Sequence, residues 1–260
     1  MKRFWNFADN NRKEMERITL MYHDVLNDTC QKSGFQKVGA VQYAIDSTTL
    51  DSHLKFAVGK DYIQFSFDDG GCSFYSVIAD MLEYYGRKGI FYITTSCIGK
   101  DYFLTEEQIK ALDQRGHIIA SHSHSHPTKI SALSKEQCLE EWTVSKSILE
   151  RIVGHEVSVA SVPGGAVSDM VVDCMIEAGY KTIYTSEPTT KVNLRNGASI
   201  IGRYGVKKGT SMDLFREILT NPKRRRKMLR HHNMLGMAKH LFGSRYNDIK
   251  QLILKIKRLR

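Results

Sequence analysis

The chain has 260 residues, with 38 Lys and Arg against 28 Asp and Glu, so its formal net charge at pH 7 is +10. Apolar residues make up 42% and charged residues 25%, a composition that excludes a disordered or a fibrous chain. This length accommodates one ample domain, or one domain with an appendage.

The basic excess is confined to one end of the sequence. Residues 222–260 contain 13 Lys and Arg and one acid, whereas residues 1–221 contain 25 basic and 27 acidic residues. We therefore predict two parts: a nearly neutral folded body at 1–221 and a basic amphipathic helical tail at 222–260.

Short apolar runs alternate with stretches of helical periodicity along the body. We expect strands at 18–23, 62–67, 89–94, 116–120, 157–161, 181–184 and 198–201. We expect helices at 74–85, 105–114, 134–153, 168–178 and 211–219, two of which begin with the capping boxes TEEQ and SKEQ. Residues 26–60 are poorly periodic, which indicates an insertion or a cap.

This alternation predicts an α/β fold with parallel strands joined by right-handed crossovers. Six or seven such units favour a barrel-like sheet, and an open doubly wound sheet is the alternative.

Two adjacent carboxylates, Asp68 and Asp69, end the strand at 62–67 and are followed by Gly70 and Gly71. Adjacent carboxylates repel each other unless a cation or hydrogen bonds compensate. On its own, the segment is also compatible with a polar loop that turns at Asp69-Gly70.

A histidine cluster follows the strand at 116–120, with His122 and His126 four residues apart and Pro127 next. Pro127 disfavours the α conformation at His126, so we place the pair on a loop. Imidazole and carboxylate groups suit Zn²⁺ or a similar divalent ion. On its own, the cluster also fits an adventitious metal-binding loop or a plain polar loop.

Taken together, the two motifs indicate a catalytic metal site. One carboxylate and two histidines leave an open position for water, and the second carboxylate is free to act as a base on that water. Both motifs follow the C-terminal ends of strands, which form the catalytic face of a β/α barrel.

Two further features fall at the same face. Pro163-Gly164-Gly165 follows the strand at 157–161 and is compatible with a plain turn or with a backbone N–H that binds an oxyanion. His23 closes the first strand and is compatible with a structural or a catalytic role.

These residues resemble the polysaccharide deacetylase family, the NodB-homology domain of carbohydrate esterase family 4. The segment 66–70 (SFDDG) is similar to its first motif and 122–127 (HSHSHP) to its second. The resemblance covers roughly residues 18–219 and implies a distorted β/α barrel that acts as a metal-dependent deacetylase of N-acetylated sugars.

The resemblance also implies residue roles. Asp68 would be the catalytic base, and Asp69, His122 and His126 would be the metal ligands. The ion would be Zn²⁺, with Co²⁺, Ni²⁺ or Mn²⁺ as alternatives. Backbone near Pro163 and Gly164 would bind the oxyanion and the substrate.

The chain departs from the family pattern at two motifs. The third motif is usually R-P-P-Y-G, but here Ser161 replaces the arginine that contacts the base and Gly164 replaces the aromatic residue. The late L-x-H motif, which carries the general acid, is not evident after Gly197. The segment Tyr22-His23 resembles members in which this motif lies at the N-terminus, which implies His23 as the general acid.

The tail combines a basic run at 223–227 with apolar residues at helical spacing in 247–260. This pattern fits peripheral attachment to an anionic membrane surface. A helix packed on the barrel with a solvated charged face fits as well. Nucleic-acid binding is disfavoured, because no recognised motif for it is present.

The start of the sequence lacks the apolar run of a signal peptide, and no stretch approaches the about 18 apolar residues of a membrane span. The five cysteines are widely spaced and form no CxxC pair, which indicates reduced thiols. We therefore expect a cytoplasmic protein, peripheral at the inner membrane.

The sequence thus predicts a metal-dependent hydrolase that removes an N-acyl group, most simply N-acetyl, from an amino sugar. The substrate would be a bacterial surface polysaccharide or its lipid-linked or nucleotide-linked precursor. The alternatives are a non-catalytic glycan-binding module that retains the barrel, and an interaction protein for which the barrel is a scaffold.

Overall fold

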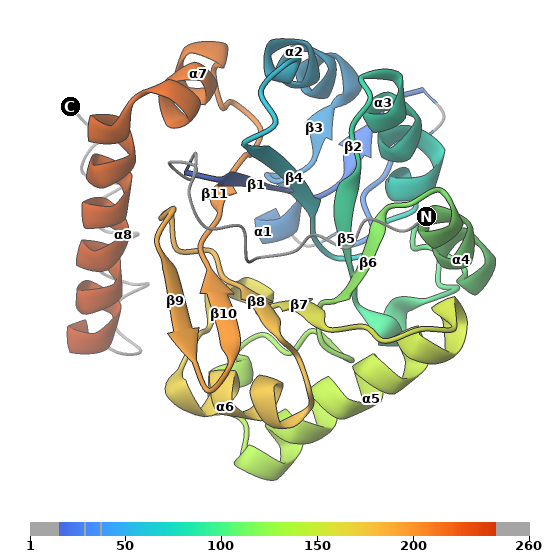
Figure 1. The fold of residues 1–260 in the computed structure, drawn as a ribbon, viewed down its shortest axis with the longest axis vertical. Coiled ribbons are helices and arrows are strands. Elements are labelled where there is room, and N and C mark those ends of the chain that lie inside the picture. Colours follow the sequence, from blue (N-terminus) through green and yellow to red (C-terminus); the bar gives the residue numbers. More distant parts are fainter. Residues whose placement is uncertain (1–15, 29, 37, 243–260) are drawn as a thin grey trace.

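The computed structural model describes residues 16–28, 30–36 and 38–242. Its centre is a curled sheet of nine strands in the order β11-β1-β4-β5-β6-β7-β8-β10-β9. Apart from the short helix α1, the helices lie around the outside of this curl (Figure 1).

The strands are β1 (Ile18–Tyr22), β2 (Val25–Leu26), β3 (Ile45–Asp46), β4 (Ile63–Phe67), β5 (Gly89–Ile93), β6 (Ile118–Ser121), β7 (Val159–Ser161), β8 (Thr182–Tyr184), β9 (Val192–Arg195), β10 (Ala198–Ile201) and β11 (Tyr204–Gly205). The helices are α1 (Val38–Val41), α2 (Ser47–Ala57), α3 (Ala79–Tyr84), α4 (Glu106–Gln114), α5 (Lys135–Val153), α6 (Asp169–Glu177), α7 (Met212–Thr220) and α8 (Pro222–Phe242). A π-helical turn at Phe74–Ile78 leads into α3.

The expected distorted β/α barrel is confirmed. Neighbouring strands of the large sheet run parallel, except that β9 pairs antiparallel with β10. The edge strands of the described sheet, β11 and β9, are not paired with each other, so the barrel is incomplete. The first strand, β1, lies between β4 and the late strand β11, so the first and last parts of the barrel sequence are neighbours in the sheet.

The expected strands and helices of the body are present with small shifts at their ends, and both capping boxes are formed, at Thr105 and Ser134. The segment 26–60 is more regular than its sequence indicates. It contains α2, which begins after Asp46, whose carboxylate accepts a hydrogen bond from the Thr49 N–H at 2.7 Å. The core-facing residues of α2 are Leu50, His53, Leu54 and Ala57.

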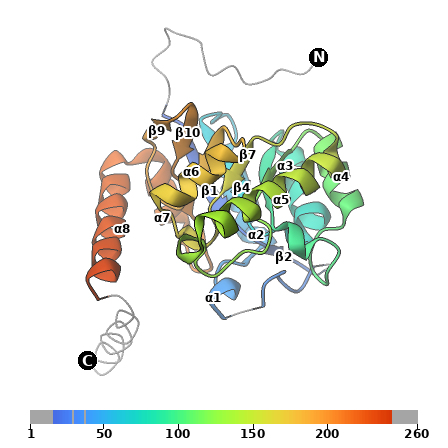
Figure 2. The same cartoon turned by 90° about the horizontal axis from the view of Figure 1, so that it is seen from below.

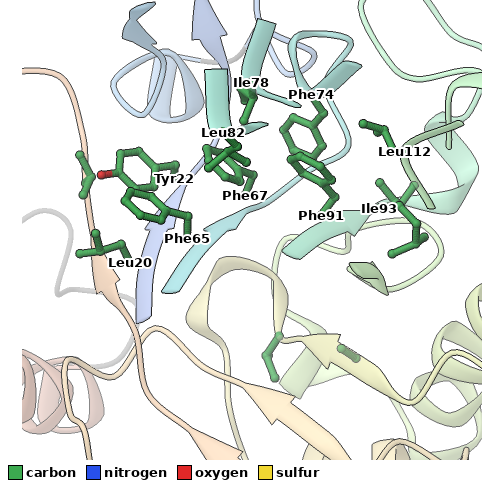
Figure 3. Close-up of a cluster of buried hydrophobic side chains, with 14 of the residues drawn as sticks. Leu20, Tyr22, Phe65, Phe67, Phe74, Ile78, Leu82, Phe91, Ile93 and Leu112 are labelled. Atoms are coloured by element: carbon green, nitrogen blue, oxygen red, sulfur yellow. The ribbon is translucent and has the colours of Figure 1, made fainter. Parts of the chain in front are cut away.

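Alternation along the strands divides the interior into two layers. On one face of the sheet, Phe65 packs on Tyr22, and Phe67 packs with Phe74 and Phe91, in the main core beneath the helices (Figure 3). Residues of opposite alternation, such as Tyr92, belong to a second, smaller cluster. Polar side chains are therefore brought into the inner layer, where the barrel holds its site.

The last described helix, α8, stands beside the barrel in both ribbon views (Figures 1 and 2). Its start is anchored by the buried Arg225, which donates hydrogen bonds to the Ile218 carbonyl at 3.0 Å and to Glu16 at 2.7 Å. Side chains from 231 to 237 are exposed. The amphipathic pattern predicted at 247–260 lies outside the described residues. Among the described helices, none is long and apolar enough to cross a bilayer.

Candidate active site

The candidate site begins where β4 ends. The Asp68 N–H donates to the Tyr22 carbonyl at 2.9 Å, which continues the β1–β4 pairing by one residue. Asp69 then turns into the left-handed region with φ of 90° and Gly70 follows with φ of 88°. Both carboxylates are buried. The turn therefore presents two adjacent carboxylates at the C-terminal edge of the sheet.

The loop after β6 brings two imidazoles to the same edge. Ser123 and His126 have φ of 65° and 53°, an uncommon conformation for residues other than glycine. The Ser123 hydroxyl stabilises this turn by accepting the His126 N–H at 3.1 Å. The predicted placement of His126 on a loop rather than inside a helix is confirmed.

Asp69, His122 and His126 form a possible metal site, because their ligand atoms all lie within 4.8 Å of one another. Each Nε2 is 3.5 Å from Asp69 Oδ1. Ligands about 2.0 Å from a tetrahedral ion lie about 3.3 Å apart. The three predicted ligands therefore fit a zinc-like divalent ion.

Ser161 fixes the orientation of the His122 ring. The ring Nδ1 lies 3.1 Å from the Ser161 carbonyl oxygen and 2.6 Å from its hydroxyl. Because the carbonyl can only accept, Nδ1 carries the proton and Nε2 keeps its lone pair toward Asp69. Such a partner behind a metal-binding histidine selects the tautomer that binds the ion.

Asp68 has an arginine partner. Ser161 does replace the arginine of the third motif, but Arg203 reaches Asp68 from the connection between β10 and β11. Its Nη1 and Nη2 donate to Asp68 Oδ1 and Oδ2 at 2.6 and 2.8 Å. Both side chains are buried, and this fork geometry is the strongest form of a carboxylate hydrogen bond.

Arg203 is held in place by the inner layer of the barrel. Its Nε donates to the Thr185 carbonyl at 3.2 Å, and its guanidinium lies 4.9 Å from the Tyr92 ring centroid. Gly202 allows the close approach of the chain, because a Cβ there would lie 2.3 Å from a backbone oxygen. Burial works to raise the pKa of Asp68, but the Arg203 charge, together with His122, outweighs it and lowers that pKa to about 2.

The pKa of the second carboxylate, Asp69, is shifted in the opposite direction. Burial, followed by repulsion from Asp68 and Asp24, raises the pKa of Asp69 well above its ordinary value. A cation bound by Asp69 would remove this repulsion. The two adjacent carboxylates therefore differ in environment, one paired with an arginine and the other facing two imidazoles.

Asp24 lies against the turn that carries the paired aspartates. No sequence motif indicates this residue. Its carboxylate accepts hydrogen bonds from Ser33 and Ser73 hydroxyls at 2.5 and 2.6 Å, and from the Gly34 N–H at 2.9 Å. A Cβ at Gly71 would lie 1.9 Å from Asp24 Oδ1. Gly71 is thus required by the close approach of Asp24.

His23 lies near the same charges. Burial lowers the pKa of His23 to about 4, against the opposing effect of Asp68. Its ring is 4.6 Å from the Tyr43 ring, and its buried Nδ1 has no hydrogen-bond partner among the described residues. The His23 Nδ1 is thus a buried polar atom whose hydrogen-bonding capacity the described residues leave unsatisfied.

Pro163 and Gly164 follow β7 as expected. Pro163 is buried and Gly164 is exposed with φ of 60°. A Cβ at Gly164 would lie 3.8 Å from the Thr128 carbonyl, in the loop that follows His126. The position agrees with a place beside the histidine loop, and binding of an oxyanion stays a prediction.

The sequence motifs do not indicate Arg203, because the third family motif places the arginine partner of the base at the end of another strand. A signal for it exists in the sequence. Arg203 interrupts an otherwise uncharged segment from 198 to 206, and a charge at such a position needs a buried partner. No comparable sequence pattern indicates Asp24, apart from its position directly after His23.

The fold and the geometry define a β/α barrel protein with a candidate metal site at the C-terminal ends of its strands. Residues 55–183 match the family model described as polysaccharide deacetylase. This region holds the paired aspartates and both histidines, whereas His23 and Arg203 lie outside it. This region of the chain belongs to the polysaccharide deacetylase family.

Related proteins agree with this family. The chain is 29% identical over 123 residues to Bacillus subtilis YxkH, whose name places it among polysaccharide deacetylases; the match covers 47% of this chain and 44% of the relative. It is 30% identical over 124 residues to a chitin deacetylase of Arthroderma benhamiae, covering 46% and 32%. The chain thus matches less than half the length of either relative.

A solved structure shows the same fold. The Streptococcus pyogenes deacetylase PplD, in complex with acetate, aligns with a TM-score of 0.63 at 18% identity. The alignment covers 78% of this chain and 97% of PplD. The likeness extends beyond the region of the family match.

Proposed function

We propose that the chain is a metal-dependent hydrolase that removes an N-acetyl group from an amino sugar of a bacterial surface polysaccharide or of its precursor. The observation that supports this most is the convergence of Asp69, His122 and His126 beside an ionised Asp68. Three protein ligands leave a position for water on an ion, and the adjacent Asp68 carboxylate can accept a proton from that water.

Each residue of the candidate site has a separate role in the proposed reaction. An ion held by Asp69, His122 and His126 would supply Lewis acidity and lower the pKa of a water molecule. Asp68 would accept the proton of the attacking water, and Arg203 keeps its carboxylate ionised and fixed in direction. The N–H groups near Gly164 would donate to the oxyanion.

We assign the protonation of the leaving amine to His23. Because burial lowers its pKa to about 4, the ring is neutral at pH 7 and must gain a proton during the reaction before it can donate one. His23→Gln should slow the release of a basic sugar amine much more than that of a weakly basic aryl amine. Equal losses for both substrates would reject this role.

The test of the function is acetate release from N-acetylated sugars. The purified chain would be stripped with a chelator, reloaded with Zn²⁺, Co²⁺, Ni²⁺ or Mn²⁺, and assayed on free, polymeric, nucleotide-linked and lipid-linked substrates. We expect release with a metal and none after stripping. Glycan binding without any release would support the non-catalytic module instead.

We further propose that α8 attaches the enzyme to an anionic membrane surface. From 222 to 242 the helix holds seven Lys and Arg and no acid, and Met234, Leu235 and Met237 are exposed on it. Basic residues near an anionic surface contribute about 1 kcal/mol each, and exposed apolar side chains add insertion. Exposed apolar residues favour lipid over nucleic acid as the partner.

A further inference from the structure

Two sulfur atoms meet beside the candidate site. The Sγ atoms of Cys30 and Cys72 are 3.3 Å apart and share a hydrogen bond. Cys72 lies three residues after Asp69, and Cys30 belongs to the connection between β2 and α1. A small displacement would bring the sulfurs to the about 2.05 Å of a disulfide.

Backbone hydrogen bonds hold the two cysteines in these positions. The Cys30 N–H donates to the Asn27 side chain at 2.8 Å, and its carbonyl accepts the Asn27 N–H at 3.0 Å. The Cys72 N–H donates to the Tyr102 carbonyl at 2.8 Å. The facing sulfurs therefore belong to two turns that are each fixed independently.

This pair differs in access from the other pair of facing cysteines, Cys138 and Cys174. Cys72 is partly exposed, whereas Cys138 and Cys174, which also contact each other, are 0% exposed. A small oxidant can therefore reach the first pair and not the second. The hydrogen bond between the two sulfurs lowers the pKa of the Cys30 thiol and raises that of Cys72, so Cys30 is the first of the two to form the reactive thiolate.

We propose that Cys30 and Cys72 are an oxidation site, at which a peroxide converts two thiols into an intramolecular disulfide. The sulfur that reacts first attacks the peroxide, the O–O bond breaks, and a sulfenic acid forms with release of water or an alcohol. The second sulfur then displaces the sulfenic hydroxyl as water, and the S–S bond forms. The thiols lose two electrons, which reduce the peroxide.

The disulfide would join the loop at 30–36 to the turn that carries the paired aspartates. This loop already contacts the site, because Ser33 and Gly34 donate to Asp24 and the Phe35 ring lies 5.0 Å from the His126 ring. Oxidation therefore restrains the residues that cover one metal ligand.

The test uses the full chain, purified with reductant, transferred to reductant-free buffer and exposed to hydrogen peroxide. Peptide mapping without reduction should show a Cys30–Cys72 cross-link that dithiothreitol removes. Hydrogen exchange of the amides at 30–36 should slow on oxidation. The matched control, Cys138→Ser with Cys174→Ser, should keep both effects, whereas Cys72→Ser and, separately, Cys30→Ser should lose both.

Four results would overturn the proposal. They are a cross-link through another cysteine, a cross-link between two chains, further oxidation of Cys72 without a cross-link, and a cross-link that leaves exchange at 30–36 unchanged. None of these readouts depends on catalysis. The disulfide can therefore be confirmed or rejected independently of the deacetylase function.

Discussion

Arg203 and Asp68 form a buried ion pair between two segments that lie 135 residues apart in the sequence. The arginine comes from the connection between β10 and β11, and the aspartate ends β4, yet both guanidinium nitrogens bind the carboxylate at 2.6 and 2.8 Å. The connection before β11 thus supplies the arginine that this chain lacks in the third motif.

Arg203→Met should unfold or inactivate the protein, because it leaves Asp68 buried without a partner. Removing one member of a buried pair costs about 3–5 kcal/mol. The matched control is Arg195→Met at the exposed pairs with Asp169 and Asp173, where we expect less than about 1 kcal/mol. Urea unfolding and acetate release would measure both variants.

Arg203→Lys separates charge from geometry. Lysine keeps the positive charge but not the fork that directs both carboxylate oxygens. We expect a folded protein with reduced kcat. If Arg203→Met and Arg203→Lys both kept the stability and the rate of the wild-type protein, the Arg203–Asp68 pair would have no role.

Ser161→Ala should weaken metal binding by roughly tenfold, since it removes the hydroxyl behind His122 and leaves the carbonyl contact. Competition with a chelator of known affinity measures this. Ser145→Ala is the matched control, because Ser145 is a buried serine that bonds Ser121 and not His122. An equal loss in both variants would contradict the orienting role of Ser161.

The sequence predicts the fold well where periodicity and capping are strong. The helix at 134–153 has an apolar stripe and a capping box, and it forms almost as expected. The segment 26–60 was less predictable, because α2 is flanked by irregular chain and its core contacts come from the barrel. Short strands such as β9 depend on a neighbour that the sequence does not reveal.

The possible metal site of Asp69, His122 and His126 was predictable because these residues follow two strands whose ends meet at one edge of a parallel sheet. Arg203 and Asp24 were not, because their partners depend on how far the sheet curls and how closely the turns approach. The Asp24 contact with Gly71, for example, joins two loops that share no sequence motif.

Acid should destabilise the fold through His53, a buried residue of α2 whose ring stacks on Phe215 at 3.7 Å and shares a hydrogen bond with Tyr22. Burial lowers its pKa to about 4, below the ordinary value of about 6.5. Between these values the unfolded chain binds a proton that the folded chain does not. Stability is therefore lost as the pH falls from about 6.5 to about 4.

His53→Gln removes this titration. The variant should have a lower free energy of unfolding at pH 7, because the stacking on Phe215 is lost. Its free energy of unfolding should decline less steeply than that of the wild type as the pH falls from 6.5 to 4. Urea titrations of the metal-free protein across this range provide the comparison. A variant with the wild-type slope would exclude His53 as a source of acid sensitivity.

Reversing three exposed charges of α8, at Arg226, Lys227 and Arg230, should reduce binding to phosphatidylglycerol vesicles by more than about 100-fold. Point changes are preferable to truncation, because Arg225 is buried against the body. Activity on a soluble substrate should be unchanged.

The matched control for α8 reverses three exposed lysines of the body, Lys191, Lys207 and Lys208, which changes the net charge equally. We expect this variant to keep its vesicle binding. Equal losses in both variants would show that net charge, not α8, drives the binding. Binding to nucleic acid but not to vesicles would also reject the membrane proposal.

The central claim, that Asp68 is a base beside a metal held by Asp69, is tested most directly by comparing Asp68→Asn with Asp69→Asn. Metal content and acetate release would be measured on the same preparations. We expect Asp68→Asn to retain the ion and lose turnover, and Asp69→Asn to lose both. Full metal content in Asp69→Asn, or undiminished acetate release in Asp68→Asn, would contradict the account.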